Sequence, residues 1–318
     1  MGKAKQHTTE QNDAEMQAQP DAYHVPVMLH EAIEALAIHP DGVYVDCTMG
    51  GGGHTKEILK QLGPAGKLIA FDQDADAEKN APADERVIFV PHNFRHLQRF
   101  LRLHGVPKVN GVLADLGVSS HQFDEGSRGF SFRFEADLDM RMDQRQGKTA
   151  ADVVNSFSAE ALQAMFSNYG EVTNARTLAQ SIVQARQTAP IKTIKDLANV
   201  LEPLAKGNPN KYFAQVFQAL RIEVNAEMEA LKEMLEQLPK VLANEGRAAI
   251  ITFHSLEDRM VKNFFKEGSF DKVEDPIYGN KNDSPFTIIT KKPVEASAAE
   301  LKINPRSRSA RLRVAEMK

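Results

Sequence analysis

The sequence predicts an α/β protein in which a Rossmann-like, mainly parallel sheet carries an inserted all-helical subdomain. Four short apolar strand patterns alternate with helical patterns between residues 43 and 115, which is typical of a parallel sheet with helices on its faces. No convincing buried-strand pattern is present over 123–212, whereas a strand pattern returns at 246–253. Residues 123–212 are therefore expected to form a separate helical unit inserted into the sheet domain.

The N-terminal half follows this alternation in order. The first helix is expected to end near Ile38, because Leu29, Ile33 and Leu36 are spaced for one helix face. Later helices are expected to begin near His54 and to cover about 94–103. Strands are expected where β-branched or apolar residues are followed by turns, at 43–46, 67–71, 86–90 and 109–115.

The C-terminal half completes the sheet after the insertion. Helices are expected at 152–169, 174–188, 193–205 and 255–265, and a long amphipathic helix at 213–242. Strands are expected at 246–253, 286–291 and 310–314, the last two as an antiparallel pair at one sheet edge. The predicted domains are a disordered tail over 1–20, a sheet domain of 21–122 and 213–318, and a helical subdomain over 123–212.

The composition excludes several classes of protein. With 318 residues and 42% hydrophobic content, the chain is large enough for one large or two smaller domains. Its single cysteine, Cys47, excludes an internal disulfide, and Cys and His residues are not grouped at metal spacing, so no metal is expected. No apolar run approaches a membrane span and the N-terminus resembles no secretory signal, so a cytoplasmic protein without membrane contact is predicted. The net charge of −4 does not by itself indicate a nucleic-acid-binding protein.

A glycine turn between the first strand and its helix predicts a cofactor site. Residues 50–53 are four glycines, which permit left-handed backbone and close approach of a ligand. Asp72 ends the second strand about 20 positions further on, where an acid hydrogen-bonds a ribose diol in nucleotide-binding βαβ units. The alternative is that Asp72 only caps the next helix.

The same turn distinguishes between two cofactor classes. A dinucleotide site needs a third glycine in G-x-G-x-x-G, but Thr55 or Lys56 occupies that position. Asp46 ends the preceding strand, and an acid beside a pyrophosphate is unfavourable, whereas an acid near a cationic sulfonium is favourable. S-adenosylmethionine is therefore favoured over NAD.

Asp115 and Ser119 are the candidate catalytic residues. Asp115 ends the fourth strand, so it is expected at the same sheet edge as Asp46 and Asp72. Methyl transfer to an amine needs in-line alignment of the nitrogen and the methyl carbon. A carboxylate or serine oxygen that accepts the N–H would raise the electron density of a conjugated amine. For Ser119, a plain turn serine is an equally good interpretation.

Two segments are candidate RNA contacts. Arg128, Phe130 and Phe132 alternate basic and aromatic side chains, which suits either a base-stacking platform or a strand with one buried face. The basic C-terminus, which includes Arg306, Arg308 and Arg311, suits either a phosphate-binding face or a charged edge strand.

His254 follows the fifth strand and is either a substrate contact or a structural residue at a helix start.

These motifs resemble the RsmH (MraW) family of bacterial ribosomal RNA methyltransferases. The matching segments run in order from about 22 to 315 and include 24–27, 46–54, 115–120, 128–132, 138–143, 217–222, 253–259 and 304–310. Three segments depart from the family pattern: His121 replaces a proline, and residues 135–137 and 211–215 differ. The last departure removes a family arginine that could contact RNA.

The resemblance implies a class I methyltransferase fold with a helical insertion and S-adenosylmethionine as cofactor. It implies methylation at N4 of a decoding-centre cytidine, cytidine 1402, of 16S rRNA in the small ribosomal subunit. Residues matching the family's cofactor contacts are Gly52, Gly53, His54, Asp72, Phe94, Asp115 and Gln122. Alternatives are a non-catalytic ribosome assembly factor with the same fold and an NAD-dependent oxidoreductase. The oligomeric state stays open, a homodimer being one alternative.

Overall fold

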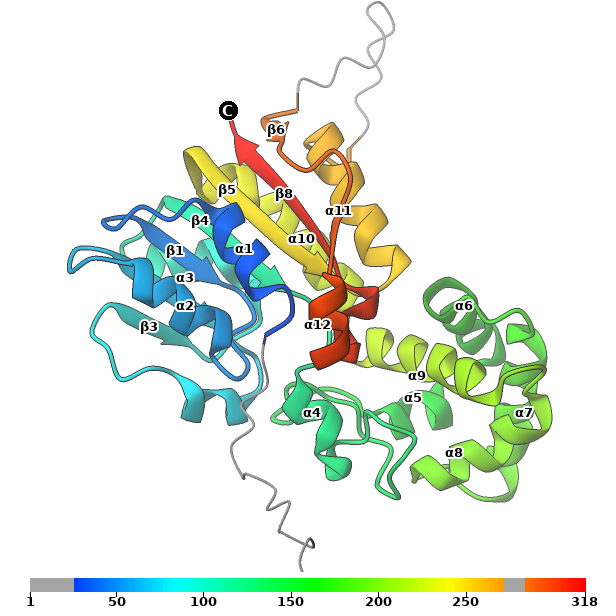
Figure 1. Ribbon diagram of the computed structural model, residues 1–318. Coiled ribbons are helices and arrows are strands. Elements are labelled where there is room, and N and C mark those ends of the chain that lie inside the picture. The colour runs from blue at the N-terminus through cyan, green and yellow to red at the C-terminus, as the bar shows by residue number, and fades with distance from the viewer. Residues whose placement is uncertain (1–25, 272–283) are drawn as a thin grey trace, which may run out of the picture.

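The computed structural model describes residues 26–271 and 284–318 (Figure 1). The expected tail over 1–20 lies outside these residues. One eight-stranded sheet has the order β3-β2-β1-β4-β5-β8-β6, and β7 also pairs with β8. Its strands are β1 (Val43–Asp46), β2 (Lys67–Phe71), β3 (Val87–Val90), β4 (Val109–Asp115), β5 (Leu242–Thr252), β6 (Phe286–Ile288), β7 (Val294–Glu295) and β8 (Arg311–Met317).

The first five strands are parallel, and β8 runs antiparallel to β5, β6 and β7. This confirms the predicted parallel sheet and the antiparallel pairing of the last two predicted strands. Strand order reverses between β1 and β4, which makes that point the topological switch of the sheet. Ligands of open α/β sheets bind at such a point, beyond the carboxyl ends of the strands.

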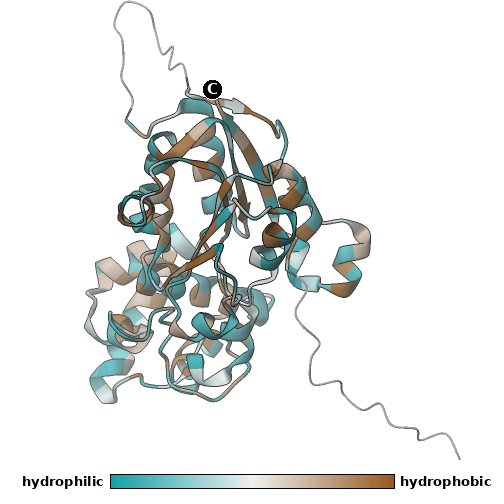
Figure 2. Ribbon diagram, turned by 90° about the vertical axis from the view of Figure 1, so that its left-hand side faces the viewer, coloured by the Kyte–Doolittle hydropathy of each residue, from teal (hydrophilic) through white to brown (hydrophobic). Residues whose placement is uncertain are grey.

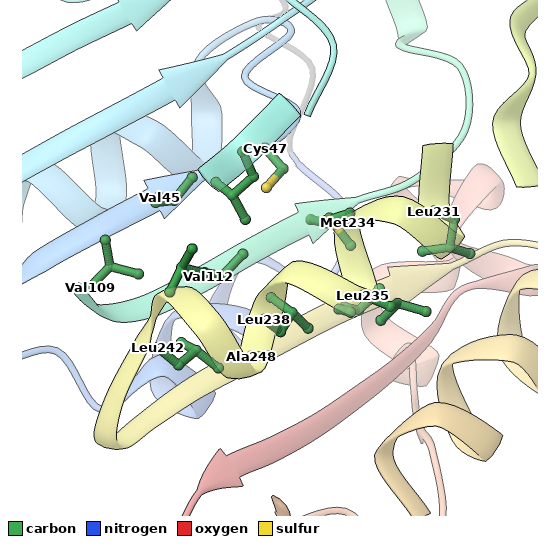
Figure 3. Close-up of a cluster of buried hydrophobic side chains, with 14 of the residues drawn as sticks. Val45, Cys47, Val109, Val112, Leu231, Met234, Leu235, Leu238, Leu242 and Ala248 are labelled. Atoms are coloured by element: carbon green, nitrogen blue, oxygen red, sulfur yellow. The ribbon is translucent and has the colours of Figure 1, made fainter. Parts of the chain in front are cut away.

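Alternate residues of β1 enter the two layers that cover the sheet. Val45 belongs to the hydrophobic cluster under α3 (Leu97–Leu103), α10 (Glu227–Val241) and α11 (Ser255–Glu267). Figure 3 shows part of this cluster between the strands and α10. Tyr44 faces the opposite cluster, under α1 (Leu29–Leu36) and α2 (Gly53–Gln61). Hydrophobic residues are accordingly concentrated along the central strands (Figure 2).

A second layer of helices has a core of its own beside the sheet (Figure 1). It contains α5 (Ala150–Ser156), α6 (Ala159–Gly170), α7 (Ala175–Thr188), α8 (Ile194–Leu201) and α9 (Pro209–Asn225). The short helices are α4 (Ser120–Asp124), α12 (Ala298–Ile303), η1 (Ala75–Asn80), η2 (Phe94–His96), η3 (Gly126–Arg128), η4 (Glu202–Leu204) and η5 (Pro305–Ser309). None of the helices in the described ranges is long and apolar enough to span a membrane.

Two predicted helices are wrong in their extent. The helix predicted over 152–169 is α5 and α6, because Phe157 is extended and Ser158 caps α6 by accepting from the Ala161 N–H. The helix predicted over 213–242 is broken at Ala226, which adopts left-handed backbone with φ 47°. Since α9 packs in the helical core and α10 on the sheet, we place the second domain boundary at Ala226 rather than at 212/213.

Candidate active site

A cavity of about 550 Å³ lies at the switch point of the sheet. Its walls come from the glycine turn, the carboxyl ends of β2 and β4, the first residues of α4 and α10, and η5. This volume is within the range of small-molecule sites. The fold therefore brings residues from both halves of the chain around one cavity.

The glycine turn forms one wall. Gly50, Gly51, Gly53 and His54 line the cavity, whereas Gly52 does not. A Cβ on Gly52 would face the carbonyl oxygen of Asn80 at 3.0 Å, and its φ of 75° favours glycine. The resemblance implies cofactor contacts by Gly52, Gly53 and His54, which leaves Gly50 and Gly51 mainly to form the turn. In the structure, Gly52 instead makes the turn that starts α2.

Asp46 holds the two ends of this turn through hydrogen bonds to Thr48 and Thr55. Its Oδ1 accepts from the Thr48 N–H at 3.0 Å and its Oδ2 accepts from the Thr55 hydroxyl at 2.7 Å. Asp46 is buried and is not part of the cavity wall. Its negative charge still acts on the site, because it helps to raise the pKa of both Asp72 and Asp115. Asp46, the acid expected near the cofactor, is therefore a buried residue that holds the turn and acts on the site through its charge.

Asp72 links the turn to the end of β2. Its carboxylate accepts from the Gly50 N–H at 2.7 Å and from the Asp74 N–H at 2.8 Å, and the side chain borders the cavity. Burial raises the pKa of Asp72 to about 6, although these two N–H donors lower it. The ionised carboxylate has further lone pairs, which suits a ligand with adjacent hydroxyl groups.

Asp115 presents an unpaired oxygen at the end of β4. Its backbone N–H donates to the Thr48 hydroxyl at 2.7 Å, and its Oδ2 lies 3.9 Å from His54 Nδ1. Its Oδ1 is buried and has no hydrogen-bond partner among the described residues. Burial raises the pKa of Asp115 well above its usual value, with the charges of Asp46 and Glu257 adding to the effect. Such an oxygen needs a donor or a positive charge from a ligand.

His54 is buried between Asp115 and the chain before α1. Its Nε2 lies 3.1 Å from the Val27 carbonyl oxygen, which makes Nε2 the protonated ring nitrogen. Burial lowers the pKa of His54, and the nearby Asp46 charge opposes this effect. Neutral His54 therefore presents Nδ1, an acceptor, toward the cavity side of Asp115.

Ser119, Gln122 and Phe94 complete the predicted set on the cavity wall. Ser119 caps α4 by accepting from the Gln122 N–H at 3.1 Å, and Gln122 Oε1 accepts from the Ser119 N–H at 3.1 Å. Ser119 is thus the N-cap of α4 and also borders the cavity. Phe94, at the start of η2, packs against the hydrophobic cluster beneath β3 and the neighbouring strands.

The predicted stacking platform is wrong. Arg128 is only 2% exposed, pairs with Asp74 at 2.8 Å and donates to two backbone carbonyls. Phe130 is buried in the helical core, and the Phe132 ring contacts two other phenylalanine rings there at centroid distances of 5.7 and 5.6 Å. Arg128 and Phe130 cannot stack on bases, because they are buried inside the protein, and Phe132 is partly buried against the same core; the alternative of burial holds.

The three basic C-terminal candidates differ in their relation to the cavity. Arg306 lines it, donates to Asp124 at 3.1 Å and lies 5.1 Å from the Phe123 ring centroid. Arg308 and Arg311 are exposed, and Arg311 Nη1 is 3.4 Å from an Asp258 oxygen. An RNA contact by these three arginines stays a prediction.

Sequence reasoning missed a group of charged residues on the far wall. Glu227 and Glu257 border the cavity, and Arg221 binds Glu227 through two hydrogen bonds of 2.8 and 2.9 Å. From the sequence alone, the acidic residues of 227–236 predict a solvated helix face. The break at Ala226, which sends Glu227 into the cavity wall, was the missing signal.

Glu227, His254 and Glu257 have ligand atoms within 4.8 Å of one another, the spacing of a metal site. His254 is the N-cap of α11, and its Nδ1 accepts from the Glu257 N–H at 3.4 Å, as the structural interpretation of this histidine expected. That bond leaves the proton on Nε2, the nitrogen that faces the carboxylates. Glu257 lies 3.2 Å from this nitrogen, and Arg221 already supplies positive charge to Glu227, so we assign no metal to this group.

The donor set of the cavity suits S-adenosylmethionine. Asp72 can accept from ribose hydroxyls, Phe94 offers a ring for the adenine, and Asp115 Oδ1 lacks the partner that a cationic or amino group would supply. The topology and this site define a class I methyltransferase, whose cofactor is S-adenosylmethionine. The chain belongs to the MraW methylase family, whose model matches residues 21–318.

Curated relatives match almost the whole chain. Ribosomal RNA small subunit methyltransferase H of Parabacteroides distasonis is 56% identical over 304 residues, which cover 95% of this chain and 99% of that protein. The protein of the same name from Bacteroides thetaiotaomicron is 53% identical over 298 residues, 93% of this chain and 98% of the relative. The solved structure of TrmN from Thermus thermophilus is far more distant, with 13% identity, a TM-score of 0.40 and coverage of 91% and 48%.

Proposed function

We propose that this protein methylates N4 of a decoding-centre cytidine of 16S rRNA in the small ribosomal subunit. The names of its curated relatives support ribosomal RNA of the small subunit as the substrate. The observation that carries the amine as acceptor is the unpaired Asp115 oxygen in the cavity wall. Such a substrate implies activity in the cytoplasm.

The residues around Asp115 account for this chemistry. When bound, the cofactor supplies an electrophilic methyl group. Asp115 accepts an N–H of the target amine, which orients the nitrogen lone pair and holds the proton that the amine must lose. A sulfonium charge nearby would favour the ionised form of Asp115, which burial alone disfavours. We infer that Ser119 borders the target base as a second positioning group.

The helical layer, with the exposed arginines of the C-terminal segment, is proposed to recognise the RNA. The target base must leave its stack to enter the cavity, as in other enzymes that modify bases. Mass mapping of methylcytidine in small-subunit rRNA from cells with and without the protein tests this function. Loss of a single N4-methylcytidine is expected; an unchanged map would favour the non-catalytic assembly factor.

A further inference from the structure

The carboxylate of Asp74 joins two other buried side chains, Gln122 and Arg128. Its Oδ2 accepts from Gln122 Nε2 at 2.7 Å and from Arg128 Nη1 at 2.8 Å. Its Oδ1 accepts from the Asp76 N–H at 3.0 Å and caps η1. Asp74, Gln122 and Arg128 are all buried, so these charge-assisted bonds are shielded from water.

Hydrogen bonds extend from this centre toward the glycine turn. The Asp74 N–H donates to Asp72 Oδ1 at 2.8 Å, and Asp72 Oδ2 accepts from the Gly50 N–H at 2.7 Å. Gln122, Asp72 and Gly50 all line the cavity. Asp74 therefore contacts, directly or through one residue, three parts of the proposed cofactor site.

Hydrogen bonds also extend toward the helical layer. Arg128 Nη2 donates to the carbonyl oxygens of Arg141 and Met142, each at 3.1 Å. The Met142 N–H donates in turn to Asn225 Oδ1 at 2.7 Å, at the end of α9. The chain of bonds thus runs from the glycine turn to the helical layer without a break.

This arrangement fixes the carboxamide of Gln122. A glutamine amide can turn over and exchange its oxygen and nitrogen unless its neighbours distinguish them. Here the Ser119 N–H donates to Oε1 and Asp74 accepts from Nε2, so only one orientation satisfies both partners. Arg128 balances the buried charge of Asp74, which would otherwise be unfavourable.

We propose that Asp74 and Arg128 are positioning residues for the cofactor: Asp74 orients Gln122 in the cavity wall, and Arg128 ties that orientation to the helical layer. The proposal rests on the proposed function, in which Gln122 contacts S-adenosylmethionine. It also gives the Arg128 motif a role other than RNA stacking. Because Asp74 acts through Gln122, its contribution to cofactor affinity should vanish when Gln122 is absent.

A double-mutant cycle tests this dependence. S-adenosylmethionine binding is measured by calorimetry for the wild type, Asp74→Asn, Gln122→Ala and the double variant. Each single substitution is expected to raise the dissociation constant about tenfold, and the double variant to match Gln122→Ala within about twofold. Additive effects, about a hundredfold for the double variant, would overturn the proposal.

Kinetics distinguish positioning from a general loss of structure. Asp74→Asn is expected to raise the KM for the cofactor about tenfold while kcat at saturating cofactor stays within about twofold. A matched control is Asp84→Asn, which also loses an aspartate paired with an arginine, here Arg86 at 2.7 Å, but whose side chain bonds no residue of the cavity wall. Equal weakening by the control would contradict the proposal.

A second variant covers the case in which Asp74→Asn does not fold. Arg128→Lys keeps the charge but lacks the planar fork that reaches Asp74 and two carbonyls at once. Arg128→Lys alone is expected to weaken cofactor binding. Added to Gln122→Ala, it is expected to cause no further loss of affinity. A loss of equal size in both backgrounds overturns the proposal. If the wild type itself bound no S-adenosylmethionine, the proposed function would fail rather than this inference.

Discussion

Gly51 and Gly53 lie two residues apart in the turn, yet only Gly51 has room for a side chain. A Cβ on Gly53 would lie 2.0 Å from Pro26 Cγ, whereas one on Gly51 would meet no described atom within 4 Å. Gly53→Ala is therefore expected to lower the free energy of unfolding by about 1–3 kcal/mol, and Gly51→Ala to change it by less than about 0.5 kcal/mol. Denaturant unfolding of both variants checks this; equal losses would contradict the packing described for Pro26.

Asp72 predicts a pH dependence of cofactor binding. With a pKa of about 6, its carboxylate is ionised at pH 8 and becomes protonated as the pH falls through 6. Because ribose hydroxyls donate to the ionised form, affinity is expected to be highest above pH 6 and to fall below it. Calorimetric titrations from pH 5 to 8 measure this trend. Asp72→Asn should bind more weakly at pH 8 and lose the trend; an unchanged pH profile in this variant would remove Asp72 from the site.

Residues at strand ends could be predicted from the sequence, and residues that meet across the fold could not. Asp72 and Asp115 follow recognisable strands, and parallel strands bring their carboxyl ends to one edge. Arg128 was misassigned because its partner, Asp74, is 54 positions away in the sequence. An alternating basic and aromatic pattern looks the same whether its side chains face RNA or a core.

At the scale of elements, the break between α9 and α10 decides where the helical layer ends. The sequence could not show it, since Ala226 is a good helix former and the amphipathic pattern continues past it. The left-handed backbone of Ala226 separates α9, in the helical core, from α10, on the sheet. The existence of the insertion was predictable from its lack of strand patterns, but its boundary depended on tertiary packing.

This break gives a prediction for stability. Left-handed backbone costs an L-residue about 1 kcal/mol that glycine avoids, so Ala226→Gly is expected to raise the free energy of unfolding by up to about 1 kcal/mol. The matched control, Ala164→Gly, lies on the exposed face of α6 and should lower it by about 1 kcal/mol. Denaturant unfolding of both proteins measures the difference. A loss of stability in Ala226→Gly would mean that α9 and α10 form one continuous helix.

At the scale of the whole molecule, a protein with a net charge of −4 must bind rRNA, which is itself negatively charged. Arg308 in η5 and Arg311 at the start of β8 are exposed, so their joint replacement by alanine should weaken RNA binding and flatten its salt dependence. The control replaces Arg99 and Arg102, two exposed arginines on α3. Filter binding at several salt concentrations gives both slopes. Identical salt-dependence slopes for the two double variants would mean that Arg308 and Arg311 do not contact RNA and only provide charge at the sheet edge.

The central claim is that this cavity transfers a methyl group to N4 of one cytidine in small-subunit rRNA. The most direct measurement incubates the purified protein with unmodified small subunits and labelled S-adenosylmethionine, then maps the product by mass spectrometry. We expect one N4-methylcytidine in 16S rRNA, and at least about a hundredfold slower transfer by Asp115→Ala, with cofactor affinity reduced far less than the rate. Methylation of a different atom, or full activity of Asp115→Ala, would contradict the account.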